Sequence, residues 1–298
     1  MRHNHLLTWG EHAVPSLGVG AMPFSWTPVH DHDDAIDVLH HAFDLGMTLV
    51  NTADIYAPSA NEVGHNERLV GDAVRSYRGG REALTVITKN GLRREGERWW
   101  RDNSREWMLR AAEHSNEMLG FEPDVIAVHR LNRTQSWREC IEALLEVRER
   151  GLAKRIGLSN VTRAEFDAAW EISDGTICIV EQERSPYYRD HSDVLDGCAE
   201  RGVAYLAWSP LGGGGKAKHL AEDNPLFAQV AEHHRTTAQN IALAWLMAQG
   251  PHLIPIPGFT RRASADAAAA AAHITLSADE IALLDASPFG ASSNDDEF

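Results

Sequence analysis

The sequence alternates short apolar runs with longer segments in which apolar positions recur at helical spacing. Each run is long enough for one buried strand and too short for a helix. We predict strands at residues 16–20, 47–50, 84–89, 124–129, 155–160, 176–180, 203–209 and 253–258. The spacing predicts helices at residues 33–45, 67–77, 104–119, 136–150, 163–172, 193–201, 227–249 and 277–285, with an alanine-rich helix before the last.

This alternation continues without a change of composition that would mark a linker, so we expect residues 1–298 to form one domain. Repeated strand–helix units require an all-parallel sheet, and eight of them close it as a (β/α)8 TIM barrel. We also expect a small hairpin or lid at Leu6, Leu7 and Gly10, extra C-terminal helices and a flexible acidic tail at 290–298. An open doubly wound sheet is the alternative, although the first strand lacks the G-x-G-x-x-G turn.

Polar residues follow directly on three of the apolar runs. Asn51 follows the run at 47–50, and Tyr56 stands five positions later, while the next two runs end in Lys89 and His129. In a parallel barrel the strands deliver such side chains to the active-site face. Each residue alone is typical of an ordinary rim position, but three consecutive strand ends with a phenol, an amine and an imidazole predict a proton-transfer site.

Composition narrows the possible partners and surroundings. A formal net charge of −15 argues against a nucleic-acid groove, because phosphate binding needs a basic face. The three cysteines are scattered and include no C-x-x-C pair, so a disulfide framework is not expected and a reducing, cytoplasmic setting fits best. The first residues lack the apolar core of a signal peptide, and no apolar run reaches the ~18 residues of a membrane span.

Sixteen histidines raise the question of a metal site. We find no H-E-x-x-H or similar ligand spacing. The adjacent pairs His40–His41 and His233–His234 fall on predicted helices, where neighbouring side chains are expected to diverge. We therefore expect surface histidines and no metal.

Several motifs, in order and spacing, resemble those of the aldo-keto reductase superfamily, particularly its bacterial single-domain members. The resemblance covers nearly the whole chain. It is carried by Gly18-Val-Gly-Ala-Met22, Asn66-Glu67 with Gly71, Ile156-Gly-Leu-Ser-Asn160, Ala207-Trp-Ser-Pro-Leu-Gly212, Ala242-Leu-Ala-Trp245 and Ile254-Pro-Ile-Pro-Gly258.

The resemblance implies a catalytic role for each of the strand-end residues. Tyr56 matches the family's proton-donating tyrosine, Lys89 its lysine and His129 its histidine. The family places an aspartate five residues before the tyrosine, and this chain has Asn51 there. Asparagine brings no charge to Lys89, so the lysine is less neutralised but also more easily deprotonated by burial, and the net effect on Tyr56 is open.

The resemblance also implies an NADP(H) site, with further departures. Ser159 and Asn160 would hold the nicotinamide carboxamide, and Trp208, followed by Ser209, would stack on the ring. Glu181 stands where the family has a glutamine, with Gln182 beside it. The pyrophosphate would be wrapped by residues 211–216, including Leu211, Gly212, Gly214 and Lys216, and the 2′-phosphate would be met by Gly258, Thr260, Arg261 and Arg262. The adenine-contacting positions are Ala267 and Ala268.

The leading hypothesis is an NADP(H)-dependent reductase of a small aldehyde or ketone, with Phe24, Trp26 and Trp99 lining an apolar pocket. A tyrosine with a pKa of ~10 is a weak acid, and a nearby lysine cation makes it a better one. The departures leave two alternatives open. One is a non-redox acid–base enzyme on the same barrel, such as an isomerase, lyase or cyclase. The other is a nucleotide-sensing protein with little turnover, as a resemblance to potassium-channel β-subunits would allow.

Overall fold

An eight-stranded parallel sheet forms the centre of the computed structural model, which describes residues 8–9, 12–26, 29–189, 192–213 and 215–290. The strands follow the order β12-β11-β10-β9-β8-β5-β4-β3. Their bounds are β3 (Val19–Gly20), β4 (Leu49–Asn51), β5 (Thr85–Asn90), β8 (Val125–Val128), β9 (Arg155–Ser159), β10 (Ile177–Glu183), β11 (Ala204–Trp208) and β12 (Leu253–Pro255).

The first and last strands close the sheet into a barrel. Gly18 N–H donates to the Pro255 carbonyl at 2.9 Å, and Gly20 N–H donates to the Pro257 carbonyl at 3.0 Å. Gly20 also forms a parallel bridge with Gly258. A Cβ on Gly20 would lie 2.8 Å from the Ile256 carbonyl oxygen, so only glycine allows this approach. The predicted (β/α)8 barrel is therefore confirmed, and the open doubly wound alternative is wrong.

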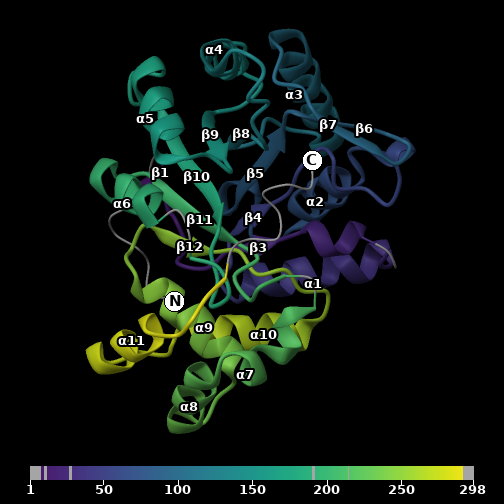
Figure 1. The fold of residues 1–298 in the computed structure, drawn as a ribbon. Helices are drawn as coiled ribbons and strands as arrows, with labels where there is room; N and C mark the ends of the chain where they lie inside the picture. The colour runs from purple at the N-terminus through teal and green to yellow at the C-terminus, as the bar shows by residue number, and fades with distance from the viewer. Residues whose placement is uncertain (1–7, 10–11, 27–28, 190–191, 214, 291–298) are drawn as a thin grey trace.

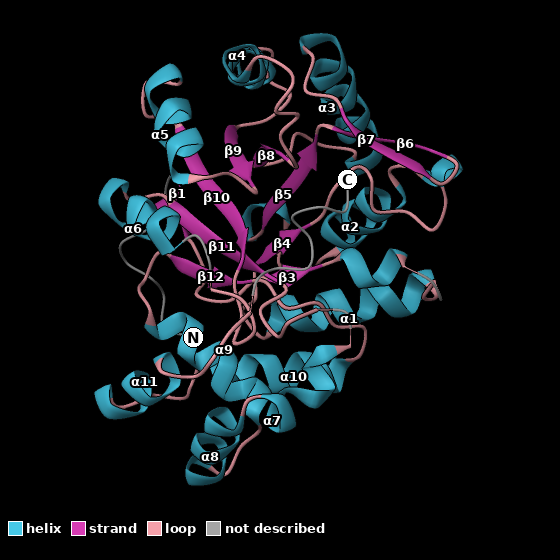
Figure 2. Ribbon diagram, in the orientation of Figure 1, coloured by secondary structure: helices cyan, strands magenta, loops and turns pink. Residues whose placement is uncertain are grey.

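Helices surround the barrel, as Figures 1 and 2 show. The outer ring consists of α1 (His32–Asp44), α2 (His65–Ser76), α3 (Arg105–Leu119), α4 (Trp137–Glu149), α5 (Arg163–Ile172), α6 (Ser192–Arg201), α9 (Ala238–Ala248) and α10 (Arg262–Ala271). Additional helices are α7 (Leu220–Asp223), α8 (Pro225–His234) and α11 (Ala278–Asp285), and short 3-10 turns occupy η1 (Met22–Ser25), η2 (Ala60–Glu62), η3 (Arg81–Ala83) and η4 (Lys216–His219). Asp31 caps α1, because its side chain accepts from the Asp33 and Asp34 N–H groups.

Two antiparallel hairpins stand outside the barrel sheet. The predicted N-terminal hairpin is present as β1 (Thr8–Trp9) paired with β2 (His12–Ala13), whereas Leu6, Leu7 and Gly10 lie outside the described residues. So does the predicted tail at 290–298, apart from its first residue, Gly290. The second hairpin, β6 (Leu92–Glu95) with β7 (Arg98–Arg101), lies between the predicted strand at 84–89 and the predicted helix at 104–119. Its arginines stack on its tryptophans, so the long polar side chains of the hairpin lie over aromatic rings.

Alternate residues of each barrel strand point inward. Leu49, Ile87, Ile179 and Leu206 belong to one buried apolar cluster that fills the barrel. Asn51, Lys89 and Glu181 each follow one of the first three by two positions, so they also point inward. The fold thus places a polar layer directly above an apolar plug, at the carboxyl ends of the strands.

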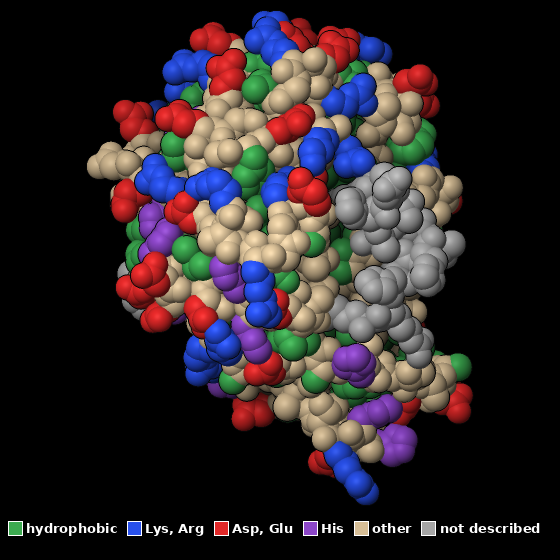
Figure 3. All heavy atoms as spheres, turned by 180° about the vertical axis from the view of Figure 1, so that it is seen from behind, with side chains coloured by type: hydrophobic (Ala, Val, Ile, Leu, Met, Phe, Trp, Pro, Cys, Tyr) green, Lys and Arg blue, Asp and Glu red, His purple; other side chains and the backbone are tan. Residues whose placement is uncertain are grey.

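The molecular surface is strongly charged. Figure 3 shows Lys and Arg interspersed with Asp and Glu over one face, with hydrophobic side chains in small separate patches. Within the described part of the chain, every helix is too short or too polar to cross a membrane.

Replacing Gly20 by alanine is expected to destabilise the protein by about 1–3 kcal/mol, because the new methyl group would press on the Ile256 carbonyl at the barrel seam. The free energy of unfolding from urea titration measures the effect. Gly290→Ala is the matched control, since a Cβ there meets no atom of the described residues within 4 Å. Equal stability of the two variants would contradict this account of barrel closure.

Candidate active site

A buried lysine is held by two side chains from different strands. Lys89 Nζ on β5 donates to Asn51 Oδ1 on β4 at 2.6 Å and to Glu181 Oε1 on β10 at 3.2 Å. Asn51 Nδ2 in turn donates to Glu181 Oε2 at 2.8 Å. Lys89 is 0% exposed, and the other two residues are 3% exposed. The three groups form a closed hydrogen-bonded triangle inside the barrel.

Glu181 supplies this triangle with the negative charge that an aspartate at position 51 would carry. Burial lowers the pKa of Lys89, but attraction to the Glu181 carboxylate and to Tyr56 outweighs it, so the pKa of Lys89 lies above its usual value. This direction favours the ammonium form of Lys89. Gln182 takes no part, because the next residue of a strand points the other way, and its side chain donates to the Val161 carbonyl.

Tyr56 and His129 lie beside the ammonium. Lys89 Nζ is 5.2 Å from the centre of the Tyr56 ring, and the Tyr56 and His129 rings meet edge to face with centroids 5.6 Å apart. Burial raises the pKa of Tyr56, Lys89 lowers it and Glu181 raises it, and the net direction is upward. Burial, with Lys89 and Arg130 nearby, holds the pKa of His129 well below its usual value. The site thus combines a protonated phenol with a neutral imidazole.

A second buried polar cluster supports this site from the α2 and α3 side. Thr88 donates to Glu67 at 2.5 Å, and Asn90 Nδ2 donates to Asp54 and to Ser115 Oγ, both at 3.0 Å. Burial raises the pKa of Glu67 to about 7, and burial together with Glu67 raises the pKa of Asp54 well above its usual value. Sequence reasoning missed these acids, although Glu67 on the inward face of an amphipathic helix was a visible signal.

The predicted nicotinamide residues stand at the ends of β9 and β11. Asn160 Nδ2 donates to the His129 carbonyl at 3.0 Å and to Ser159 Oγ at 2.8 Å, which links them to the proton-transfer residues. Asn160 has a φ of 58° and Ser209 a φ of 46°, a backbone region that non-glycine residues rarely adopt. Trp208 is partly exposed, and its indole Nε1 has no partner among the described residues.

The glycine-rich segment after β11 turns sharply. Gly212 and Gly213 have φ values of 90° and 61°, whereas Gly214 lies outside the described residues. Leu211 packs on the core, and Lys216 is exposed with its Nζ 5.2 Å from the Tyr187 ring. This part of the chain offers backbone N–H groups and one cation near the end of β11.

The predicted phosphate residues stand at the start of α10. Gly258 and Arg261 are exposed, Thr260 is half-buried, and no side chain caps the helix, so its first N–H groups are available to an anion. Arg262 is instead paired with Asp37 on α1. Of the two departures at the adenine positions, Ala268 is buried at 6% exposure in the core, whereas Ala267 is exposed.

The three predicted substrate-pocket residues have different surroundings. Phe24 is 1% exposed and packs in the helix-side core, so its ring presents no surface to a ligand in this structure. Trp26 is 47% exposed. Trp99 packs with Tyr56 against a small apolar cluster formed by Ala53, Ile55 and Leu92. The hairpin β6–β7 therefore brings Trp99 to the candidate catalytic tyrosine.

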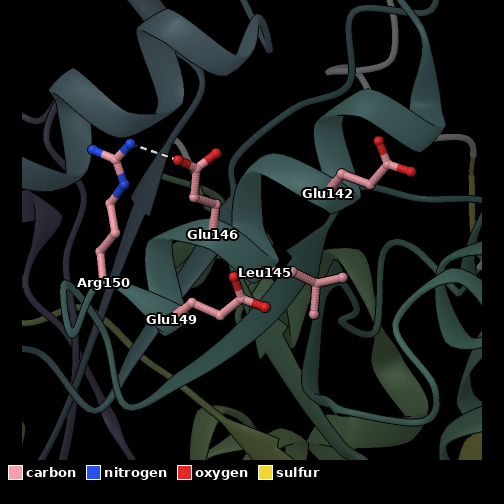
Figure 4. Close-up of a pocket in the computed structure, with 5 residues that line it drawn as sticks. All are labelled: Glu142, Leu145, Glu146, Glu149 and Arg150. Atoms are coloured by element: carbon pink, nitrogen blue, oxygen red, sulfur yellow. Dashed lines mark hydrogen bonds and ion pairs between the residues drawn. The ribbon is translucent and has the colours of Figure 1, made fainter.

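A surface hollow elsewhere lies on the outer side of α4. Glu142, Leu145, Glu146, Glu149 and Arg150 line it (Figure 4). Glu146 is paired there with Arg105 and Arg150. All five lining residues come from one helix and its end, so the hollow is separate from the strand-end site.

Comparisons with known proteins agree with this geometry. A model of the aldo/keto reductase family matches residues 16–287. The chain is 30% identical over 296 residues to pyridoxine 4-dehydrogenase of Escherichia coli strain K12, an alignment that covers 95% of this chain and 98% of the relative.

Solved structures of similar fold carry the same family name. An aldo/keto reductase from Klebsiella pneumoniae in complex with NADP and acetate is 25% identical, with a TM-score of 0.76 over 92% of this chain and 91% of that one. A thermostable aldo-keto reductase in complex with the inhibitor epalrestat is 27% identical, with a TM-score of 0.77 over 93% of this chain and 96% of that one.

Exchanging the charge between positions 51 and 181 tests the triangle. Glu181→Gln is expected to cost about 3–5 kcal/mol of unfolding free energy, because it leaves the Lys89 cation buried without a counter-charge. Asn51→Asp alone adds an unpaired carboxylate and also destabilises. The double variant returns the charge to position 51 and is expected to recover most of the loss.

Guanidinium unfolding of the four proteins measures this coupling as a double-mutant cycle. The exposed Glu171→Gln on α5 is the control for loss of a carboxylate and is expected to leave stability unchanged. A double variant as unstable as the sum of the two single variants would refute the exchange.

Glu67 makes stability depend on pH. Its folded-state pKa of about 7 lies above the ordinary value of 4.5, so the folded state binds the extra proton between these pH values and stability falls as pH rises through that window. The total fall is on the order of 3 kcal/mol. Glu67→Gln is expected to flatten it, whereas the exposed Glu113→Gln keeps it. Denaturant unfolding at pH values from ~5 to ~8 measures the free energy of unfolding of each protein. Parallel curves of this free energy against pH for wild type and Glu67→Gln would contradict the raised pKa of Glu67.

Proposed function

The chain is an enzyme of the aldo/keto reductase family, and on that premise we propose that it reduces an aldehyde or ketone to an alcohol with NADP(H), with Tyr56 as the proton donor. The observation that carries the proposal is the convergence of Tyr56, Lys89 and His129, with Lys89 kept charged by Glu181. A protonated phenol, a fixed cation and a neutral imidazole are what protonation of a carbonyl oxygen requires.

Each side chain has a separate task in this proposal. Bound NADPH supplies the hydride to the carbonyl carbon. Tyr56 donates its phenolic proton to the oxygen, and the Lys89 ammonium stabilises the phenolate that remains. His129 is neutral, so its ring can donate a hydrogen bond to the substrate oxygen without competing as the acid. Glu181 and Asn51 hold Lys89 in place and do not touch the substrate.

The residues around the strand ends fit a nicotinamide dinucleotide. Trp208 Nε1, which has no hydrogen-bond partner among the described residues, and the unusual backbone at Asn160 and Ser209 stand where the nicotinamide is expected. Ser159, Leu211, Gly212, Lys216, Gly258 and Thr260 complete the proposed contacts. The uncapped start of α10 together with Arg261 suits the 2′-phosphate of NADP rather than the free hydroxyl of NAD. Arg262, paired with Asp37, serves to hold α10 against α1.

The proposed substrate is an aromatic aldehyde. Trp99 and Tyr56 share an apolar cluster at the site, and flat aromatic rings pack well against such side chains. The relative named pyridoxine 4-dehydrogenase acts on an aromatic ring that carries an alcohol. The aldehyde formed from that alcohol at the 4 position of pyridoxine is therefore the first substrate to test, beside benzaldehyde and simple aliphatic aldehydes.

The decisive assay follows NADPH oxidation with this panel of aldehydes. Tyr56→Phe is expected to lower kcat by roughly 10²–10⁴-fold while NADPH binding, measured by tryptophan fluorescence, stays as in wild type. Tyr77→Phe, which removes a phenol that bonds Asp44 away from the site, is the matched control.

Each other outcome supports a different reading of the protein. Absence of NADPH binding would overturn the proposal and favour the non-redox acid–base enzyme. Binding without turnover on the whole panel would favour a nucleotide sensor. Turnover that survives in Tyr56→Phe would remove Tyr56 as the acid.

A further inference from the structure

Two histidines and a glutamate meet where α8 ends and α11 begins. Among the residues that the structure describes, His233, His234 and Glu280 form a group whose three possible ligand atoms all lie within 4.8 Å of one another. The expectation that adjacent histidines diverge is confirmed for His40 and His41, which contact Ala73 and Asp266, and is wrong for His233 and His234. His233 reaches Glu280 through the near nitrogen Nδ1 and His234 through the far nitrogen Nε2, so the two rings meet at one oxygen.

We propose that His233, His234 and Glu280 bind a divalent transition-metal ion such as Zn²⁺, outside the active site. His233 Nδ1 is 2.8 Å and His234 Nε2 is 2.9 Å from the same oxygen, Glu280 Oε1. Ligand atoms around a tetrahedral zinc stand about 3.3 Å apart, since zinc–nitrogen and zinc–oxygen bonds are about 2.0–2.1 Å. Small side-chain rotations therefore open the present arrangement enough to admit an ion.

The carboxylate is already oriented for this role. Its other oxygen, Oε2, accepts hydrogen bonds from Ser277 N–H at 2.8 Å and from Ser277 Oγ at 2.9 Å in the capping box of α11. These bonds turn Oε1 toward the histidines, as hydrogen bonds behind a metal ligand do in known metal sites.

The donor set selects among metals. Two imidazole nitrogens and one carboxylate oxygen suit zinc, nickel and copper, whereas calcium and magnesium prefer oxygen ligands throughout. The His233 side chain is 78% exposed, so water can complete the coordination. A bound ion would cross-link α8 to α11, which pack against each other at the periphery of the barrel (Figure 1).

The experiment titrates the untagged, chelator-treated full-length protein with ZnCl2 by calorimetry and records the thermal midpoint with and without Zn²⁺. The expected result is one saturable site and a raised midpoint. In His233→Ala and His234→Ala both effects are lost, whereas the exposed His273→Ala, which removes a histidine outside the group, keeps them.

Coordination itself has a separate signature. Co²⁺ in the same site is expected to give visible absorption bands that Zn²⁺ abolishes and that both histidine variants lack. Absence of saturable binding to the wild type, or equal binding by His233→Ala and His273→Ala, would overturn the proposal and leave the three residues as an ion-paired contact between helices. Neither outcome depends on the reductase activity.

Discussion

The ion pair between Lys89 and Glu181 is the interaction on which the site depends. An ammonium without exposed surface needs a negative partner, because burial alone would deprotonate it. Here the partner comes from β10, across the barrel, and not from the neighbouring strand at position 51. Asn51 then serves as a neutral bridge between the two charged groups. The net charge of the triangle is the same as if an aspartate stood at position 51 and a glutamine at position 181.

Strand register makes this exchange possible. In a closed barrel, inward-facing residues of different strands form layers, so side chains far apart in sequence share one level. Position 51 and position 181 are both inward and both lie one layer above the apolar plug. Either can therefore supply the charge, and the seam at Gly18 and Gly20 protects this geometry because it keeps the barrel closed.

The same surroundings shift the pKa values of the titratable groups in and around the triangle in different directions. Burial and the charges near it keep Tyr56 protonated and His129 neutral, and they favour the protonated forms of Glu67 and Asp54. Each group thus holds one defined protonation state near neutral pH, apart from Glu67, which titrates there. Such pKa shifts in neighbouring titratable groups are typical of proton-transfer sites. The buried pair Glu67 and Asp54 adds a proton-binding group beside the triangle.

The sequence by itself determined the strand–helix alternation, the closed parallel barrel and the identity of the residues at its strand ends, because apolar periodicity and abrupt polar endings are local signals. It did not reveal that residues 92–101 form a hairpin, because arginines stacked on tryptophans hold the two strands together and give no alternation of apolar and polar residues in the sequence. Only the tertiary structure decided that Glu181 neutralises Lys89, that Phe24 is buried and that His233 and His234 meet at Glu280. Each of these depends on side chains from distant segments, whose distances and orientations are set by packing and not by neighbours in the chain.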